Sequence, residues 1–165
     1  MNQSISDKVD SKIKEDLSPT RNLTGLHLKV VATIAIIWSL FQLWYASPFP
    51  FWFNFGMFKG LPARAIHLGF ALTLAFLIYP TFKGKKISIF DIIISFVGAF
   101  CCLYIYFFYD QLVDRGGVLL SIPFGKSFNL PVELILGSFG ILILLEATRR
   151  AIGLPLVVIA ICFLL

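Results

Sequence analysis

The fold is decided by Ile89–Tyr109, which reads IFDIIISFVGAFCCLYIYFFY. Asp91 is the only charged residue in this run, and a helix of this length rises about 30 Å at 1.5 Å per residue. That rise matches the thickness of the hydrocarbon core of a bilayer. Ser88 and Asp91 have the spacing of a capping box, which favours a helix start. The run therefore predicts a transmembrane helix.

Further apolar runs lie on both sides of this one, at about 26–46, 63–79 and 131–151, and prolines mark several of their ends. Residues 152–165 form a link and an apolar stretch of about half a span, which we interpret as the truncated start of the next membrane helix. The predicted fold class is all-α: a polytopic membrane helix bundle of four transmembrane helices plus the start of a fifth. Because a chain end in lipid is unfavourable, we expect the sequence to be a fragment.

Three regions follow from this pattern. Residues 1–24 form a polar tail without the apolar stretch of a signal peptide, residues 25–151 form the four-helix transmembrane domain, and residues 152–165 form the link. Within the domain, residues 49–61 combine many aromatic side chains with proline, asparagine and glycine. That composition favours a segment at the lipid headgroups over a spanning helix. Residues 110–129 are expected to form a polar loop.

The composition indicates lipid as the main solvent. The chain is 58% hydrophobic and 14% charged, whereas a soluble domain carries roughly 25% charged residues. The net charge of +5 comes from basic residues scattered between apolar runs, which argues against nucleic-acid binding. The three cysteines lie in apolar runs without metal-site spacing, and no catalytic motif is present. We therefore expect no enzyme activity, no metal and no cofactor.

The basic residues predict the orientation in the membrane. The N-terminal tail, the segment Lys83–Lys86 and the pair Arg149 and Arg150 fall on one side and carry most of the basic charge. The positive-inside rule places that side, with the N-terminus, in the cytosol. The loops between the first and second spans and between the third and fourth spans then face the exterior.

Five polar residues near span ends are candidates for interdomain or lipid contacts. Arg64 and His67 share a helix face near the outer end of the second span. Either the two hold a lipid headgroup or a partner's carboxylate, or Arg64 snorkels to the surface and His67 hydrogen-bonds a neighbouring helix. Glu146 is spaced to pair with Arg149 and Arg150. That pairing is either a local anchor at the cytosolic boundary or a clamp onto a second membrane domain.

Two functions that need paired groups are disfavoured. His27 and His67 lie at opposite ends of their spans, which argues against a haem held between two imidazoles. No second carboxylate is expected at the depth of Glu146, which argues against a proton relay. The polar residues of the spans therefore favour structural contacts.

Two stretches carry a resemblance to a known family: RAIHLGFA, which begins at Arg64, and LEATRRAIGLP, which ends at Pro155. They resemble the N-terminal region of fused permeases of the tripartite ATP-independent periplasmic (TRAP) transporters, and the likeness covers most of residues 26–165. In that family a small four-helix membrane domain precedes a large twelve-helix domain. A periplasmic binding protein delivers organic acids, and a sodium gradient drives their uptake.

The resemblance implies a membrane component of a TRAP-type secondary transporter in the bacterial inner (cytoplasmic) membrane, with the small domain as a scaffold. Its partners would be a large permease domain, fused or separate, a periplasmic solute-binding protein and membrane lipid. The substrate-binding and sodium sites would belong to the large domain, so no catalytic or substrate-binding residue is assigned in this chain. The alternative is a self-contained four-helix membrane anchor or assembly protein without transport activity.

Overall fold

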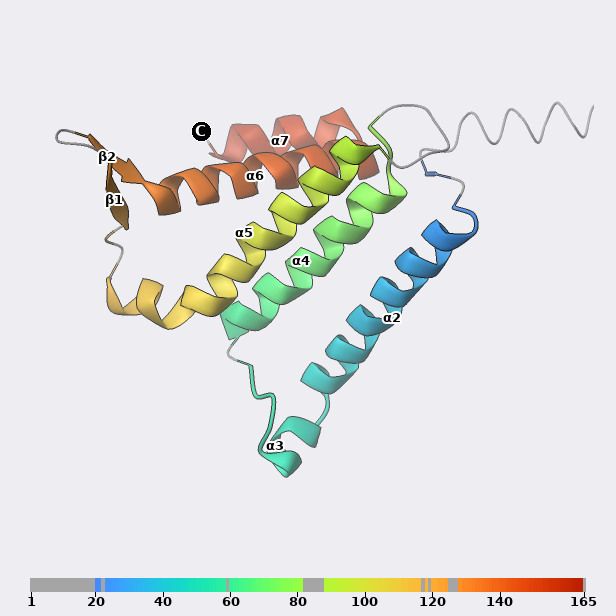
Figure 1. The fold of residues 1–165 in the computed structure, drawn as a ribbon, viewed down its shortest axis with the longest axis horizontal. Helices are drawn as coiled ribbons and strands as arrows, with labels where there is room; N and C mark the ends of the chain where they lie inside the picture. Colours follow the sequence, from blue (N-terminus) through green and yellow to red (C-terminus); the bar gives the residue numbers. More distant parts are fainter. Residues whose placement is uncertain are drawn as a thin grey trace, which may run out of the picture.

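The computed structural model describes residues 20–21, 23–58, 60–81, 88–116, 118, 120–124 and 128–164. Most of the predicted tail, the Lys83–Lys86 segment and part of the predicted polar loop lie outside these residues. The described chain is mainly helical, in the order α2 (Leu26–Ala46), α3 (Phe49–Phe53), α4 (Gly60–Ile78), α5 (Ile89–Asp114), α6 (Val132–Ala151) and α7 (Leu154–Leu164) (Figure 1). A short antiparallel hairpin, β1 (Ser121–Phe124) and β2 (Phe128–Pro131), precedes α6, with Ser121 opposite Pro131.

Three helices, α2, α4 and α5, are long and apolar enough to cross a membrane by length and composition. They lie where three of the apolar runs predicted helices. The structure begins α4 slightly earlier, at Gly60, and continues α5 to Asp114, into the predicted loop. Residues 110–114 contain no glycine or proline, and the chain turns only where Gly116 adopts a φ of 58°. Three such helices indicate a membrane-embedded, multi-pass protein.

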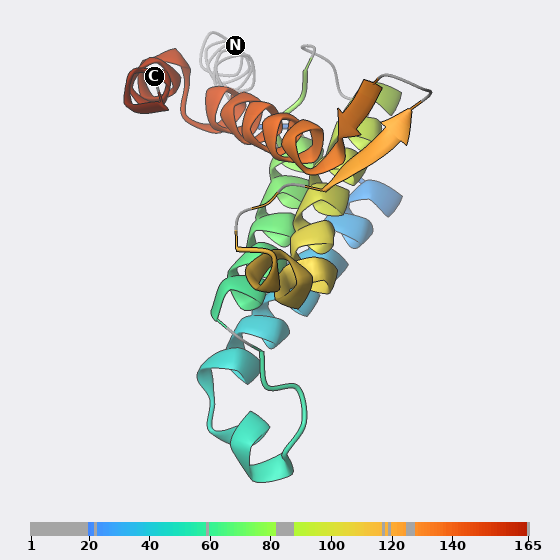
Figure 2. The same ribbon diagram turned by 90° about the vertical axis from the view of Figure 1, so that its left-hand side faces the viewer.

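The fourth predicted span corresponds to α6, whose bounds are almost those expected. Unlike α2, α4 and α5, this helix is not apolar enough to be a candidate membrane span. The physical reason is its charge, because its 20 residues include Glu133, Glu146, Arg149 and Arg150. The helix α7 has 11 residues, about half a span. Figures 1 and 2 show α6 and α7 lying across one end of α4 and α5 rather than parallel to them.

The predicted capping box at the start of α5 forms only in part. Ser88 caps α5, since its hydroxyl oxygen accepts a hydrogen bond from the Phe90 N–H at 3.3 Å. Asp91 does not complete the capping box, because its carboxylate points into the bundle toward arginine side chains. Gly25, with a φ of 60°, is the N-cap of α2. In the predicted aromatic segment at 49–61, residues Phe49–Phe53 form the short helix α3, and Gly60 and Leu61 already belong to α4.

The core lies where α4, α5 and α6 meet. Phe76 is fully buried and packs with four other buried residues of these helices: Leu72, Cys102, Ile143 and Ala147. At Gly98 of α5, a Cβ atom would lie 3.0 Å from the Cγ2 atom of Ile143 on α6. The absence of a side chain at Gly98 therefore permits the close approach of α5 and α6.

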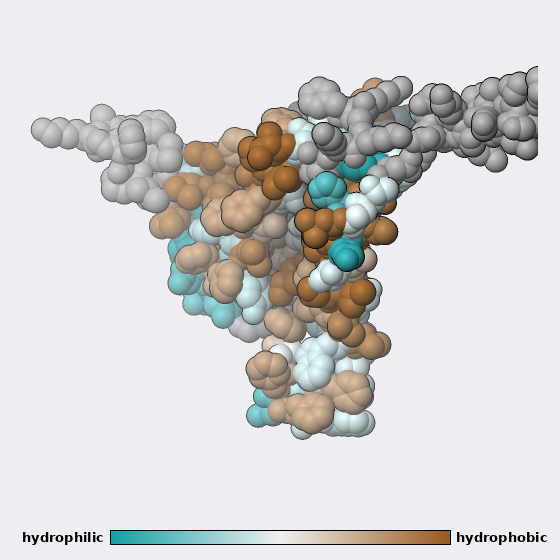
Figure 3. Space-filling view, turned by 45° about the vertical axis from the view of Figure 1, so that its right-hand side comes forward, coloured by the Kyte–Doolittle hydropathy of each residue, from teal (hydrophilic) through white to brown (hydrophobic). Residues whose placement is uncertain are grey.

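Large apolar side chains face outward over much of the described surface. Phe96 of α5 is 71% exposed, Leu142 of α6 is 61% exposed, and Phe163 of α7 is 89% exposed. Figure 3 shows hydrophobic residues over much of one face, with hydrophilic residues gathered in a few groups. Exposed apolar area on this scale marks contact with a membrane or with another protein.

The close approach at Gly98 is tested by Gly98→Leu. We expect this variant to unfold at a lower temperature in detergent, because a side chain that enters a filled contact typically costs about 1–3 kcal/mol. Gly137→Leu on α6 is the matched control, since a Cβ atom there has no neighbour within 4 Å. Equal melting temperatures for the two variants would contradict the packing described here.

Candidate functional site

Asp91 lies at the centre of a buried ion cluster. It sits in the first turn of α5 and is fully buried. Its Oδ2 atom accepts a hydrogen bond from Arg21 Nη2 at 2.8 Å, and its Oδ1 atom accepts one from Arg150 Nη1 at 2.9 Å. The hydroxyl of Thr81 also donates to Oδ1. One carboxylate thus joins three chain segments.

Arg21 connects the chain before α2 to the end of α4. Its backbone N–H donates to the Ile78 carbonyl at 2.9 Å, and its Nη1 atom donates to the Leu77 carbonyl at 3.1 Å. The last carbonyls of a helix have no partner within the helix, so Arg21 supplies donors that α4 needs. Its side chain is 1% exposed. This residue is therefore a buried structural contact and not part of a solvated tail.

Arg150 lies in the last turn of α6 and reaches the same point from the other side. Its side chain is 4% exposed, and its guanidinium carbon lies 4.8 Å above the centre of the Phe76 ring. Its Nε atom donates to Glu146 at 2.7 Å, and its Nη1 atom donates to the Tyr79 carbonyl at 3.5 Å as well as to Asp91. A cation in the last turn also complements the helix dipole. Arg150 thus connects α6 to the ends of α4 and α5.

Glu146 and Arg149 extend this set toward the surface. The Nε and Nη2 atoms of Arg149 donate to the two carboxylate oxygens of Glu146 at 2.7 and 2.8 Å. The predicted pairing of Glu146 with Arg149 and Arg150 is therefore confirmed. Arg149 is 45% exposed at its side chain and Glu146 is 30% exposed, whereas Arg150 faces inward. The exposed parts of Arg149 and Glu146 can contact a partner, whereas the Arg150 side chain makes its contacts inside the protein.

We refer to Arg21, Asp91, Glu146, Arg149 and Arg150 as the helix-end cluster. Moving each ion out of water costs several kcal/mol, so a buried pair adds little net stability, but removing one partner is strongly destabilising. The Nε atom of Arg21 and the Nη2 atom of Arg150 are buried without a protein partner among the described residues. The cluster therefore fixes where the helix ends lie more than it adds to the free energy of unfolding.

Neither Arg21 nor Asp91 is among the site candidates that the sequence predicts. Arg21 falls within the predicted polar tail, and Asp91 fits a capping box. The available signal was that Asp91 is the one charged residue of its apolar run and falls on the same predicted side as Arg149 and Arg150. The reason given against a proton relay is also wrong, because Arg150 bridges Asp91 and Glu146 at one depth. Both carboxylates are, however, paired with arginines.

The two candidates on α4 lie at the opposite end of that helix. His67 faces α2, where its Nδ1 atom lies 2.6 Å from Gln42 Nε2 and 3.3 Å from Trp38 Nε1. Of the two interpretations of His67, the structure shows the hydrogen bond to a neighbouring helix. Arg64 is exposed and makes no hydrogen bond or ion pair with the residues that the structure describes. The structure thus leaves Arg64 free for a contact outside the described chain.

A second ion pair fixes the start of α6. Glu133 is buried, pairs with Arg115, and accepts hydrogen bonds from the Tyr104 hydroxyl at 3.1 Å and the Leu120 N–H at 2.8 Å. Tyr104 belongs to α5, so α6 is attached to that helix at both of its ends. Across the described part of the chain, no group of three or more metal-ligating side chains is close enough to hold a metal ion.

The role of the central carboxylate is tested by Asp91→Asn. We expect a loss of about 3–5 kcal/mol in the free energy of unfolding in detergent, because two buried guanidinium groups lose their counter-ion. Asp114→Asn makes the same chemical change at an exposed position of the same helix and should alter stability by less than about 0.5 kcal/mol. A similar small effect of both variants would argue against a buried cluster.

Comparisons with known proteins were made at three levels. Searches of protein families, of curated proteins and of solved structures found no match to this chain. The function proposed below therefore depends on the residues and contacts of the chain itself.

Proposed function

We propose that this chain is the small membrane domain of a TRAP-type secondary transporter for organic acids, and that it acts as a scaffold for a large permease domain. The helix-end cluster carries this proposal. Glu146, Arg149 and Arg150 belong to the stretch that resembles the family, and the cluster connects the ends of α4, α5 and α6. A scaffold needs a fixed bundle against which a second domain can move.

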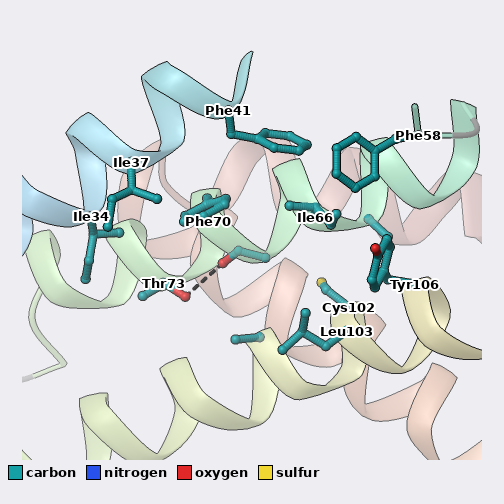
Figure 4. Close-up of a pocket in the computed structure, with 13 residues that line it drawn as sticks. Ile34, Ile37, Phe41, Phe58, Ile66, Phe70, Thr73, Cys102, Leu103 and Tyr106 are labelled. Atoms are coloured by element: carbon teal, nitrogen blue, oxygen red, sulfur yellow. Dashed lines mark hydrogen bonds between the residues drawn. The ribbon is translucent and has the colours of Figure 1, made fainter. Parts of the chain in front are cut away.

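One cavity of the bundle does not suit an organic acid. It has a volume of about 500 Å³, lies between α2, α4 and α5, and is lined almost entirely by apolar side chains (Figure 4). The hydroxyl of Thr73 in its wall donates to the Gly69 carbonyl of the same helix at 2.8 Å. An organic acid needs cations or N–H donors, which these walls lack. In this proposal the substrate and sodium sites belong to the permease domain.

In this proposal α6 is the fourth membrane helix and α7 begins a fifth. Charged residues are tolerated within a membrane domain when they face its interior and pair with one another. Glu133 pairs with Arg115, and Arg150 pairs with Asp91 and Glu146. These pairs reduce the cost of placing α6 among lipids. The exposed apolar faces of α6 and α7 are then the surface on which a permease domain packs.

The proposed setting is the bacterial inner membrane, with the N-terminus and the helix-end cluster on the cytosolic side. A periplasmic binding protein would then deliver solute at the opposite face. The short helix α3 and the β1–β2 hairpin belong to the segments assigned to that outer face by the positive-inside rule.

The transport role is tested by deleting the gene and measuring uptake of a panel of labelled mono- and dicarboxylic acids. We expect the deletion to abolish sodium-dependent uptake of at least one acid, and the wild-type gene to restore it, because a permease domain without its scaffold is not assembled. Full uptake of every acid in the deletion strain would refute the proposal and favour the alternative of a membrane anchor. A strain lacking an unrelated membrane protein of similar size is the control.

A further inference from the structure

A small cavity lies beside the end of α4 that is remote from the helix-end cluster. Its volume is about 380 Å³, and its walls come from α2 and α4. Arg64 and His67 line it on α4, and Gln42 and Tyr45 line it on α2. Among the described residues that line this recess there is no carboxylate, and the only charged one is the cation Arg64.

The hydrogen bonds of His67 determine what this cavity offers a ligand. An indole nitrogen can only donate, so the contact from Trp38 Nε1 makes His67 Nδ1 an acceptor. The ring proton then lies on Nε2, which has no partner among the described residues. Arg64 adds a guanidinium group that is exposed and unpaired within the described chain. Together they present N–H donors, which suits the oxygens of a phosphate group.

The larger apolar cavity adjoins this recess. Phe41 of α2 lines both of them. Figure 4 shows Ile37 and Phe41 of α2 on one side of the apolar cavity and Ile66 and Phe70 of α4 on the other. The helix α2 is the least buried of the three candidate spans. Arg21, just before α2, and His67, opposite its second half, attach this helix to α4 by hydrogen bonds, and Val31 of α2 packs with Leu74 and Leu77 of α4.

We infer that the two cavities form one binding site for an acidic phospholipid. Its phosphate binds Arg64 and His67, and one acyl chain fills the apolar cavity between α2, α4 and α5. Free phosphate would leave the apolar cavity unfilled, and an apolar helix of another protein would leave the donors of the recess unpaired. An acidic headgroup fits better than a zwitterionic one, because none of the described residues lining the recess is a carboxylate that could pair with an ammonium group.

The test is lipid retention by the full chain, purified in detergent and incubated with equal amounts of phosphatidylglycerol and phosphatidylethanolamine. Native mass spectrometry should show preferential retention of phosphatidylglycerol. Arg64→Gln should lower that retention about tenfold, as expected for the loss of charge-assisted hydrogen bonds. Lys29→Gln removes an exposed cation at the other end of α2 and should leave retention unchanged.

A second variant separates the acyl-chain contact from the headgroup contact. Ile37→Trp narrows the apolar cavity without changing charge, and it should lower retention of phosphatidylglycerol while circular dichroism shows an unchanged helix content. Equal retention of the two lipids by the wild type, or equal effects of Arg64→Gln and Lys29→Gln, would overturn the inference. A photo-crosslinker at Ile66 that attaches to a protein instead of a lipid in cells would identify a partner helix as the occupant and would also overturn it.

Discussion

The rest of the structure depends on the ion pairs that Asp91 makes with Arg21 and Arg150. These residues come from three separate parts of the chain, and their side chains are almost completely buried. A buried carboxylate between two guanidinium groups has few alternatives, because any other arrangement leaves a charge without a partner in a medium of low dielectric. The pairs therefore determine which ends of α4, α5 and α6 meet, and they bring the segment before α2 to the same point.

The second attachment of α6, through Glu133, explains its unusual position. One end of this helix is held to the middle of α5 by Tyr104, and the other is held to the start of α5 by Asp91. Lipid tails are as apolar as the helix surfaces, so apolar packing alone would not determine how α6 crosses α5 in a membrane. The paired charges at the two ends of α6 do determine it. A bundle fixed in this way, with apolar outer faces, supports the scaffold role that we propose. The inferred lipid would complete it on the side where α2 is only partly packed.

The sequence predicted the long helices more reliably than the contacts between them. Spanning length and the small number of charged residues identify α2, α4 and α5, because the bilayer itself sets the pattern. The pairing of Glu146 with Arg149 and Arg150 followed from helix periodicity. The partners of Asp91 lie 70 and 59 residues away in the chain, and a local capping pattern offered a competing explanation for the same side chain. The hairpin before α6 was missed because its strands are four residues long and contain proline.

The most direct test of the central ion pair is a double-mutant cycle of Asp91→Asn and Arg150→Gln, measured as the free energy of unfolding in detergent. If the two side chains are in buried contact, the double variant should be more stable than the sum of the single effects predicts. The expected coupling is about 0.5–3 kcal/mol, the range for residues that share an ion pair. Strictly additive effects would show that Asp91 and Arg150 do not meet and would contradict the structure at its most important contact.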